Sequence, residues 1–327
     1  MANDSPLARF RGRLKLPLIA APMFLVSGVD LVVAACRNGV IGAFPTVNCR
    51  STEELDGWLS GIEGRLRAHE EAQGEPAAPV CPNLIVHRSN PRLAEDVTVL
   101  LRHRCELAIT SVGSPAPVIA PLHDVGALVI ADVASIRHAE RALEAGADGL
   151  VLLTAGAGGQ TGWLNAFAFV RAVRAFFAGP IVLAGGISDG HALRAAQTLG
   201  CDLAYMGTKF IATRESMAEE RYKAMLVESG ADDILLTTAF MGLQTNMLKP
   251  SIIAAGLDPD NLPGRGAIEI GKDIDVAARE ARPKRWRDIW SAGHSISGVT
   301  EVLGVDELVA RTLTEYRAAA AEIRTPR

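Results

Sequence analysis

The chain has 327 residues, of which 49% are hydrophobic and only 5% aromatic, and its formal net charge is −4. An aliphatic composition favours buried parallel strands, and interspersed charges argue against a nucleic acid or an anionic membrane surface as partner, so we expect a small-molecule substrate. Five scattered cysteines without a Cys-x-x-Cys spacing predict neither zinc nor disulfides, and the absence of a signal-peptide core or a long apolar run predicts a cytoplasmic protein.

Eight short apolar runs follow one another along the chain, each with a segment of helical pattern behind it. The predicted strands are residues 18–23, 40–44, 80–86, 107–112, 127–133, 149–153, 180–187 and 203–210. The predicted helices are residues 28–38, 52–69, 92–104, 115–125, 135–145, 167–177, 189–199 and 216–229. Eight consecutive strand–helix units predict an α/β fold of the (β/α)₈, or TIM, barrel type. A doubly wound sheet is the main alternative, but it has fewer consecutive units.

The strand–helix rhythm breaks after the eighth unit. Residues 230–281 contain polar pieces punctuated by Gly and Pro, and the tail from residue 282 returns to a helical pattern. We therefore predict a barrel formed by residues 1–229 and 282–327. Residues 230–281 are predicted to form a smaller, mostly helical cap that is inserted after the eighth strand and helps to define the substrate pocket.

The segment from Gly149 to Trp163 joins a buried strand to a glycine-rich loop that carries one amide side chain, Gln160. Glycines allow the backbone to approach a ligand closely; here they are Gly156, Gly158, Gly159 and Gly162. A dinucleotide-binding turn is a poor match, because the spacing is not G-x-G-x-x-G and no acidic residue follows until Asp189. A turn without a ligand is the simpler alternative.

Glycines also follow the seventh and eighth predicted strands, where barrels of this type bind phosphate. Gly185 and Gly186 precede a predicted helix, so amides at its N-terminus are expected to face a phosphate. Gly207 and Thr208 add an amide and a hydroxyl after the eighth strand. Two ordinary βα turns are the alternative, but the coincidence of two such sites favours phosphate binding.

Other polar residues near strand ends include Asn83, Asp132 and Gln160. There is no G-x-S-x-G motif, and no pair of carboxylates lies at matching strand ends. These residues therefore predict a site in which a cofactor supplies the difficult chemistry and the protein binds and orients it.

Six segments, in this order, resemble the nitronate monooxygenase family, formerly called 2-nitropropane dioxygenases. They are Ala20-Ala-Pro-Met23, Asn83-Leu-Ile-Val-His-Arg-Ser-Asn90, Ala157-Gly-Gly-Gln-Thr-Gly162, Ala184-Gly-Gly-Ile187, Gly207-Thr-Lys-Phe-Ile-Ala-Thr-Arg-Glu215 and Trp290-Ser-Ala-Gly293. The resemblance covers nearly the whole chain and implies an FMN-dependent barrel. It implies that Gly185, Gly186, Gly207 and Thr208 bind the FMN phosphate and that Ala21, Pro22 and Met23 contact its ring near Asn83. We include Gly158, Gly159 and Asp132 among the expected cofactor-binding residues.

The chain departs from the family at Gln160, where relatives commonly carry a His that is taken as catalytic. Gln cannot act as a general acid or base, although a nitronate is already an anion and needs only a hydrogen-bond donor. Relatives often have Gln in the segment where this chain has His294, so we expect Gln160 and His294 to be the catalytic residues. The resemblance implies oxidation of small alkyl nitronates with O₂. An NAD(P)H-dependent reductase of quinones or enoyl thioesters, and a flavin-binding protein that has lost turnover, are the alternatives.

Overall fold

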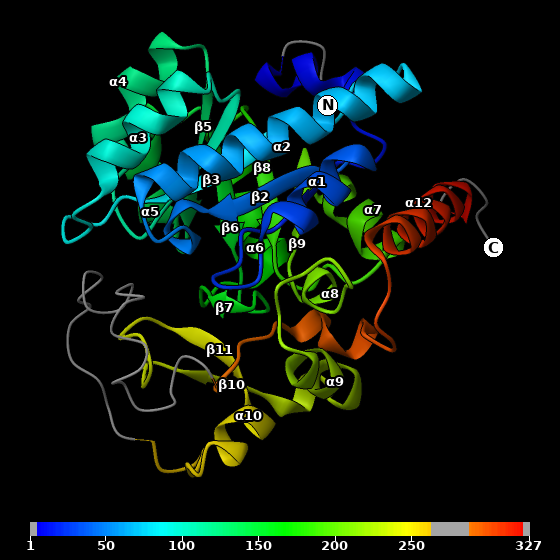
Figure 1. Ribbon diagram of the computed structural model, residues 1–327. Coiled ribbons are helices and arrows are strands. Elements are labelled where there is room, and N and C mark those ends of the chain that lie inside the picture. The colour runs from blue at the N-terminus through cyan, green and yellow to red at the C-terminus, as the bar shows by residue number, and fades with distance from the viewer. Residues whose placement is uncertain (1–4, 263–287, 323–327) are drawn as a thin grey trace.

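The computed structural model describes residues 5–262 and 288–322. Eight parallel strands close into a barrel in the order β1-β2-β3-β4-β5-β6-β8-β9, with β9 pairing back to β1 (Figure 1). The strands are β1 (Leu18–Ala20), β2 (Ile41–Pro45), β3 (Val80–Ile85), β4 (Leu107–Ser111), β5 (Leu128–Val133), β6 (Gly149–Leu153), β8 (Ile181–Ala184) and β9 (Leu203–Met206). The barrel predicted from the sequence is confirmed; β8 and β9 are its seventh and eighth strands.

Helices connect these strands as a (β/α)₈ barrel requires. They are α1 (Val29–Arg37), α2 (Thr52–Gln73), α3 (Leu93–Arg102), α4 (Ala116–Asp124), α5 (Ile136–Glu144), α6 (Ala166–Arg174), α7 (Gly190–Leu199), α8 (Thr208–Ile211) and α9 (Glu220–Glu228). The local sequence explains where several of these helices begin. Ser51, Ser135 and Asp189 each cap a helix by accepting a hydrogen bond from a backbone N–H of its first turn, which satisfies donors that have no partner within the helix.

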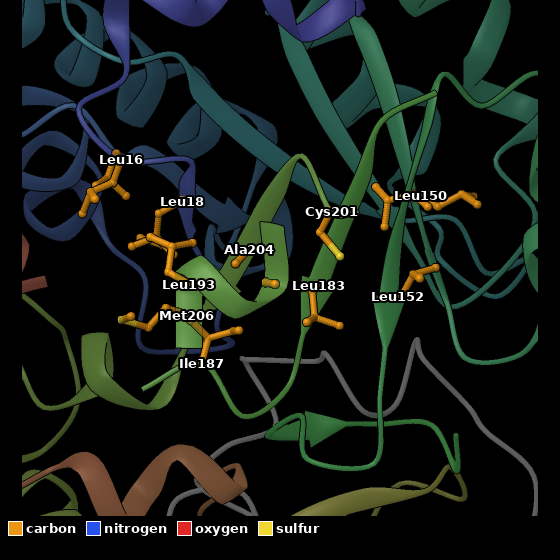
Figure 2. Close-up of a cluster of buried hydrophobic side chains, with 14 of the residues drawn as sticks. Leu16, Leu18, Leu150, Leu152, Leu183, Ile187, Leu193, Cys201, Ala204 and Met206 are labelled. Carbon is orange, nitrogen blue, oxygen red and sulfur yellow. The ribbon is translucent and has the colours of Figure 1, made fainter. Parts of the chain in front are cut away.

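Apolar side chains on the outer face of the strands pack against the surrounding helices. Figure 2 shows this layer around Leu18, Leu152 and Met206, with Leu193 of α7 packed in the same cluster. The inner face is filled by a second cluster, to which the 3₁₀-helix η1 (Pro6–Arg13) contributes Leu7 and Phe10. The barrel is therefore a packed core, and only its strand ends are available for a site.

The C-terminal helix α12 (Val305–Glu322) lies beside α7 (Figure 1). A Cβ on Gly190, the first residue of α7, would lie 2.1 Å from the backbone N of Tyr316. Only glycine permits this approach, so the sequence at the start of α7 fixes how the C-terminal helix packs onto the barrel.

A second sheet lies outside the barrel. It has the order β10-β11-β7 and is antiparallel, with strands β10 (Ile234–Thr237), β11 (Thr245–Leu248) and β7 (Gly159–Gln160). The remaining short elements are η2 (Thr46–Asn48), η3 (Ala231–Asp233), α10 (Lys249–Ala254) and η6 (His294–Gly298). The described part of the predicted cap thus contains two strands that the sequence pattern did not indicate; residues 263–281 of that cap lie outside the described residues. Among the described helices, none has the length and apolar character needed to cross a bilayer.

Candidate active site

The turn between β8 and α7 is shaped by two glycines with positive φ, 122° at Gly185 and 75° at Gly186, a conformation that L side chains rarely adopt. A Cβ on Gly185 would lie 2.3 Å from Thr154 Oγ1, whereas no atom lies within 4 Å of a Cβ on Gly186. Gly186 is exposed, and its N–H donates no hydrogen bond within the described residues. The turn therefore leaves an accessible, unused donor at the end of a barrel strand.

The N-terminus of α7 is occupied by the protein itself. Asp189 accepts a hydrogen bond from Ala192 N at 2.8 Å, and Glu315 accepts one from Gly190 N at 2.9 Å. The sequence suggested that amides of this helix terminus would face a phosphate. In the structure two carboxylates accept hydrogen bonds from its amides, whereas the N–H of Gly186 in the preceding turn has no partner among the described residues.

The end of β9 lies against the loop that follows β1. A Cβ on Gly207 would lie 3.6 Å from both Ala21 Cβ and Met23 Sδ. The neighbouring Thr208 is buried, and its Oγ1 accepts a hydrogen bond from Gly293 N at 3.0 Å. Gly207, Ala21 and Met23, which the sequence assigned to one site, therefore lie close together. Pro22 lies between Ala21 and Met23 in the chain.

Asn48 and Ser27, which were not among the predicted site residues, hold the loop after β1 in place. Asn48 accepts a hydrogen bond from Leu25 N at 2.9 Å and donates to the carbonyl oxygens of Met23 and Ser27 at 3.1 and 2.9 Å. Ser27 Oγ accepts from Met23 N and donates to Ala21 O. These bonds stabilise Leu25 at a φ of 61°, a strained conformation for a residue with a side chain.

The glycine-rich loop after β6 runs alongside residues 291–294 in the opposite direction. A Cβ on Gly159 would lie 3.7 Å from Ser291 Oγ, and one on Gly158 would lie 2.7 Å from Gly293 N. At the other end, Gly156 O accepts a hydrogen bond from His294 N at 3.0 Å. The glycines therefore allow backbone-to-backbone packing, which no larger residue at position 158 would permit.

Gln160 lies at one end of this paired segment. It is partly buried in β7, opposite Thr245 of β11, so a strand of the outer sheet fixes its backbone. Asn246, the next residue of β11, is buried and donates to Ala155 O at 2.9 Å and to Ala157 O at 2.7 Å. No local sequence pattern predicts this anchor, because its partners lie about 90 positions earlier in the chain.

His294 lies at the other end, beside the β8–α7 turn. The position of a Cβ on Gly156 is 3.3 Å from His294 Nδ1 and 3.5 Å from Gly186 N. The imidazole is exposed. The structure thus places His294 close to the turn of Gly185 and Gly186. Gln160 lies at the opposite end of the glycine-rich loop.

Three polar side chains lie inside the barrel, below the strand ends. Asn83 and Asp132 were predicted from the sequence as site residues, and Tyr205 is their neighbour. The Asn83 amide lies 3.3 Å from Ser111 Oγ. Asp132 Oδ1 and the Tyr205 hydroxyl are buried without a hydrogen-bond partner among the described residues, although part of the Asp132 side chain is accessible. Burial raises the pKa of Asp132 to about 8 and raises that of Tyr205 well above its usual range. At neutral pH this region therefore presents a neutral carboxylic acid and a neutral phenol.

Further features of the described residues concern the requirements of a metal centre and of a reactive thiol. No group of three or more His, Cys, Asp or Glu side chains among them is arranged to hold a metal ion. All five cysteines are buried and unpaired, and burial raises the pKa of Cys36 to about 12. A cavity of about 300 Å³ lies near the opposite end of the barrel, lined by residues such as Leu59, Leu66 and Arg67. It contains none of the predicted site residues.

These features fit a flavin. The turn of Gly185 and Gly186 offers an unused N–H at an open position, the second glycine site lies beside Ala21 and Met23, and Asp132 provides a covered oxygen without a partner. A phosphate anion accepts hydrogen bonds from backbone N–H groups such as that of Gly186, and a flat polar ring needs apolar contacts on its face and a polar partner such as Asp132 at its edge.

Comparison with known proteins supports this interpretation. Residues 65–315 match the family model described as "Nitronate monooxygenase". The chain is 27% identical to a nitronate monooxygenase of Paraburkholderia phytofirmans, over 94% of each protein. It is 26% identical to a (3aS,4S,5R,7aS)-5-hydroxy-7a-methyl-1-oxo-octahydro-1H-indene-4-carboxyl-CoA dehydrogenase of Mycobacterium tuberculosis, over 77% of this chain and 68% of that protein. The fold is similar to that of FabK from Thermotoga maritima, with a TM-score of 0.79, 22% identity and coverage of 98% of each chain.

Proposed function

The chain belongs to the nitronate monooxygenase family of flavin-dependent oxidoreductases, and from this premise we propose that it binds FMN and oxidises small alkyl nitronates with O₂. The observation that carries the proposal is the open turn of Gly185 and Gly186, whose unused donor lies beside the glycine-rich loop. This turn supports one phosphate site. The sequence contains no second phosphate motif of the kind that a dinucleotide needs, which favours FMN over FAD.

Gly185, Gly186, Gly207 and Thr208 would hold the phosphate, and Ala21, Pro22 and Met23 would contact the ring. Thr208 Oγ1 already accepts a hydrogen bond from Gly293 N, so its hydroxyl hydrogen remains available to donate to an anion. When bound, the flavin supplies the electron-transfer chemistry that protein side chains lack.

Gln160 is the residue that we propose to orient the substrate. Its amide can donate two hydrogen bonds but cannot exchange a proton near neutral pH. A nitronate is already deprotonated, so a fixed donor is sufficient to hold its negative oxygens and no protein base has to act first. Pairing of Gly159 and Gln160 with β11 provides the rigidity that such positioning requires.

A reductase is the second candidate. One relative is named as a dehydrogenase of a carboxyl-CoA thioester. Reduction of a quinone or an enoyl thioester by NAD(P)H through the flavin takes up protons as well as a hydride, and with an amide at position 160 water would have to supply these protons. Trp163 and Phe167 are 76% and 65% exposed just after Gln160, so an apolar substrate would find a large apolar surface there. A flavin-binding protein without turnover is the third candidate.

Anaerobic mixing of the purified protein separates the three. Loss of flavin absorbance on addition of an alkyl nitronate, followed by its return with O₂, is the expected result. Loss of absorbance with NADH or NADPH, but not with nitronate, would establish the reductase instead. No change with either reductant would leave a flavin-binding protein without turnover, and purified protein that neither contains nor takes up flavin would overturn the proposal.

A further inference from the structure

We propose that His294 is a ligand of the flavin phosphate, which makes cofactor affinity dependent on the charge of one imidazole. The proposal rests on the proposed FMN function. It assigns His294 to cofactor binding and not to proton transfer at the substrate, the role expected from the sequence.

The position of the imidazole is set by its backbone. His294 N donates to Gly156 O at 3.0 Å. Its neighbour Gly293 packs so closely that a Cβ there would lie 2.6 Å from Gly156 O and 2.8 Å from Gly158 N. Gly293 N also donates to Thr208 Oγ1 at 3.0 Å. The backbone of His294 is therefore bonded to the glycine-rich loop, and that of its neighbour Gly293 to Thr208, one of the residues expected to bind the phosphate.

The imidazole itself faces the phosphate turn. A single point, the position of a Cβ on Gly156, lies 3.3 Å from His294 Nδ1 and 3.5 Å from Gly186 N. Gly186 N donates to no atom of the described residues, and no hydrogen bond of the His294 side chain is present among them. Both nitrogens therefore lie close to Gly156 and to each other, so a phosphate group beside Gly156 would be within reach of both.

The surrounding charges leave a role for a cation. Asp189 and Glu315 bring two carboxylates to the start of α7, next to the turn. On α8, which packs against η6, the Lys209 ammonium donates to Gly298 O at 2.6 Å. The other charged groups close to Lys209 are Arg311 and Glu301. The 3₁₀-helix η3, which contains Asp232 and Asp233, packs against η6. A dianionic phosphate in this mostly acidic environment gains from a protonated imidazole.

The separation of His294 and Gln160 along the paired segment argues against a shared catalytic role for these two residues. Gly159 lies beside Ser291, whereas Gly156 lies beside His294, so the two predicted catalytic residues occupy opposite ends of the paired segment. A nitronate held by Gln160 would be closer to Ser291 than to the imidazole. His294 is in position to bind the phosphate end of FMN.

The test compares FMN with riboflavin, which has the same ring and no phosphate. The full-length protein, freed of flavin, is titrated with each by quenching of flavin fluorescence, at about pH 5.5 and about pH 8.5, which lie below and above the usual histidine pKa of about 6.5. Variants are His294→Ala, His294→Gln and His294→Lys. His138→Ala is the matched control, because His138 is exposed on α5 and belongs to none of the predicted site residues.

At the lower pH, His294→Ala should weaken FMN binding about 10- to 100-fold, as expected for loss of a hydrogen bond to a charged group, and should leave riboflavin binding unchanged. Wild-type affinity for FMN should fall towards the higher pH, while His294→Lys, which stays charged, should bind FMN tightly at both. His294→Gln should lie between Ala and wild type.

Equal effects of His294→Ala on FMN and riboflavin, or none on either, would overturn the inference and leave the flavin function intact. Loss of kcat in FMN-saturated His294→Ala with unchanged FMN affinity would return the histidine to catalysis. Failure of the wild type to bind either flavin would overturn the inference and the proposed function together. Riboflavin binding by each variant shows that it is folded.

Discussion

Asn246 joins the outer sheet to the glycine-rich loop by donating both hydrogens of its side-chain amide, one to Ala157 O at 2.7 Å and one to Ala155 O at 2.9 Å. Asn246 is 1% exposed, so its amide hydrogens depend on these two carbonyls as partners. The bonds cross from strand β11 to the segment that follows β6. They fix the loop that carries Gln160 on one side and the backbone partner of His294 on the other.

Replacing Asn246 should therefore disturb cofactor binding as well as stability. Asn246→Ala removes the donor from one buried and one partly buried carbonyl, at about 1–3 kcal/mol for the buried one, and Asn246→Asp adds a carboxylate that repels both oxygens. We expect lower unfolding free energy in urea and reduced flavin content, with the Asp variant more affected. In the control Asn38→Ala, a similar amide bond to Ala34 O on α1 is lost, and flavin content should stay normal. Normal flavin content in Asn246→Asp would contradict this role.

The two glycines of the phosphate turn should respond differently to substitution. Gly186→Ala meets no atom within 4 Å, so only its positive φ opposes it, at a cost of roughly 1 kcal/mol. Gly186→Asp adds a negative charge where the phosphate is expected, so FMN should be lost while riboflavin still binds. Gly185→Ala would place a methyl 2.3 Å from Thr154 Oγ1 and should lose both flavins. Full FMN retention in Gly186→Asp, measured by titration, would refute the placement of the phosphate.

Strand β6 shows why the barrel could be predicted from the sequence. Gly149–Leu153 is a short, entirely apolar run, and that local signal is repeated in seven further strands, each followed by a helix. The signal is local because a strand buried on both faces must be apolar along its whole length. Closure of the sheet then follows from the number of units.

The strands β10 and β11 pair with each other as a short antiparallel hairpin, but each has only four residues, and the pairing of β11 with β7 is not local. β10 is partly exposed, and β11 pairs with only two residues of the glycine-rich loop. The function of Asn246 could not be predicted for the same reason: its partners are backbone carbonyls of alanines about 90 positions earlier in the chain. The location of His294 likewise depends on close packing of Gly293 against Gly156 and Gly158, which spacing along the sequence does not reveal.

Asp132 should make stability depend on pH. Its pKa is raised to about 8 by burial, whereas an unfolded Asp loses its proton near pH 4. Between these values the folded state binds more protons than the unfolded state, so this group lowers the unfolding free energy as pH rises, by about 1.4 kcal/mol per pH unit. The contribution is complete below about pH 4 and lost above about pH 8.

The variant Asp132→Asn removes this dependence while keeping the shape of the side chain. The difference in unfolding free energy between variant and wild type, measured by urea titration of the flavin-free protein, should grow in favour of the variant across the same pH range. All other titrating groups are common to both proteins and cancel in the difference. Parallel pH profiles would show that Asp132 is ionised in the folded protein.

Gln160 provides the test of the chemistry. If its amide only donates a hydrogen bond to an anionic substrate, Gln160→Ala should lower kcat/KM for nitronate by the equivalent of about 1.5–3 kcal/mol. The loss should be nearly the same at every pH, because an amide does not titrate in this range. FMN content should stay normal, since position 160 is held in β7 through its backbone pairing with Thr245. A loss that varies with pH would mean that Gln160 acts through a titrating neighbour.

Gln160→His completes the argument, because it introduces at this position the acid–base group that relatives in the family commonly carry. If the protein is a nitronate monooxygenase with an altered substrate contact, the variant should keep or raise nitronate turnover. A new inflection in kcat/KM should then appear near pH 6.5, where histidines titrate. The inflection should persist in the double variant Gln160→His/His294→Ala assayed at saturating FMN, since His294 is proposed to bind phosphate only. If nitronate turnover does not rise and NADH-dependent reduction of a quinone or an enoyl thioester is retained, the glutamine marks a different substrate, and the reductase would replace nitronate oxidation as the function.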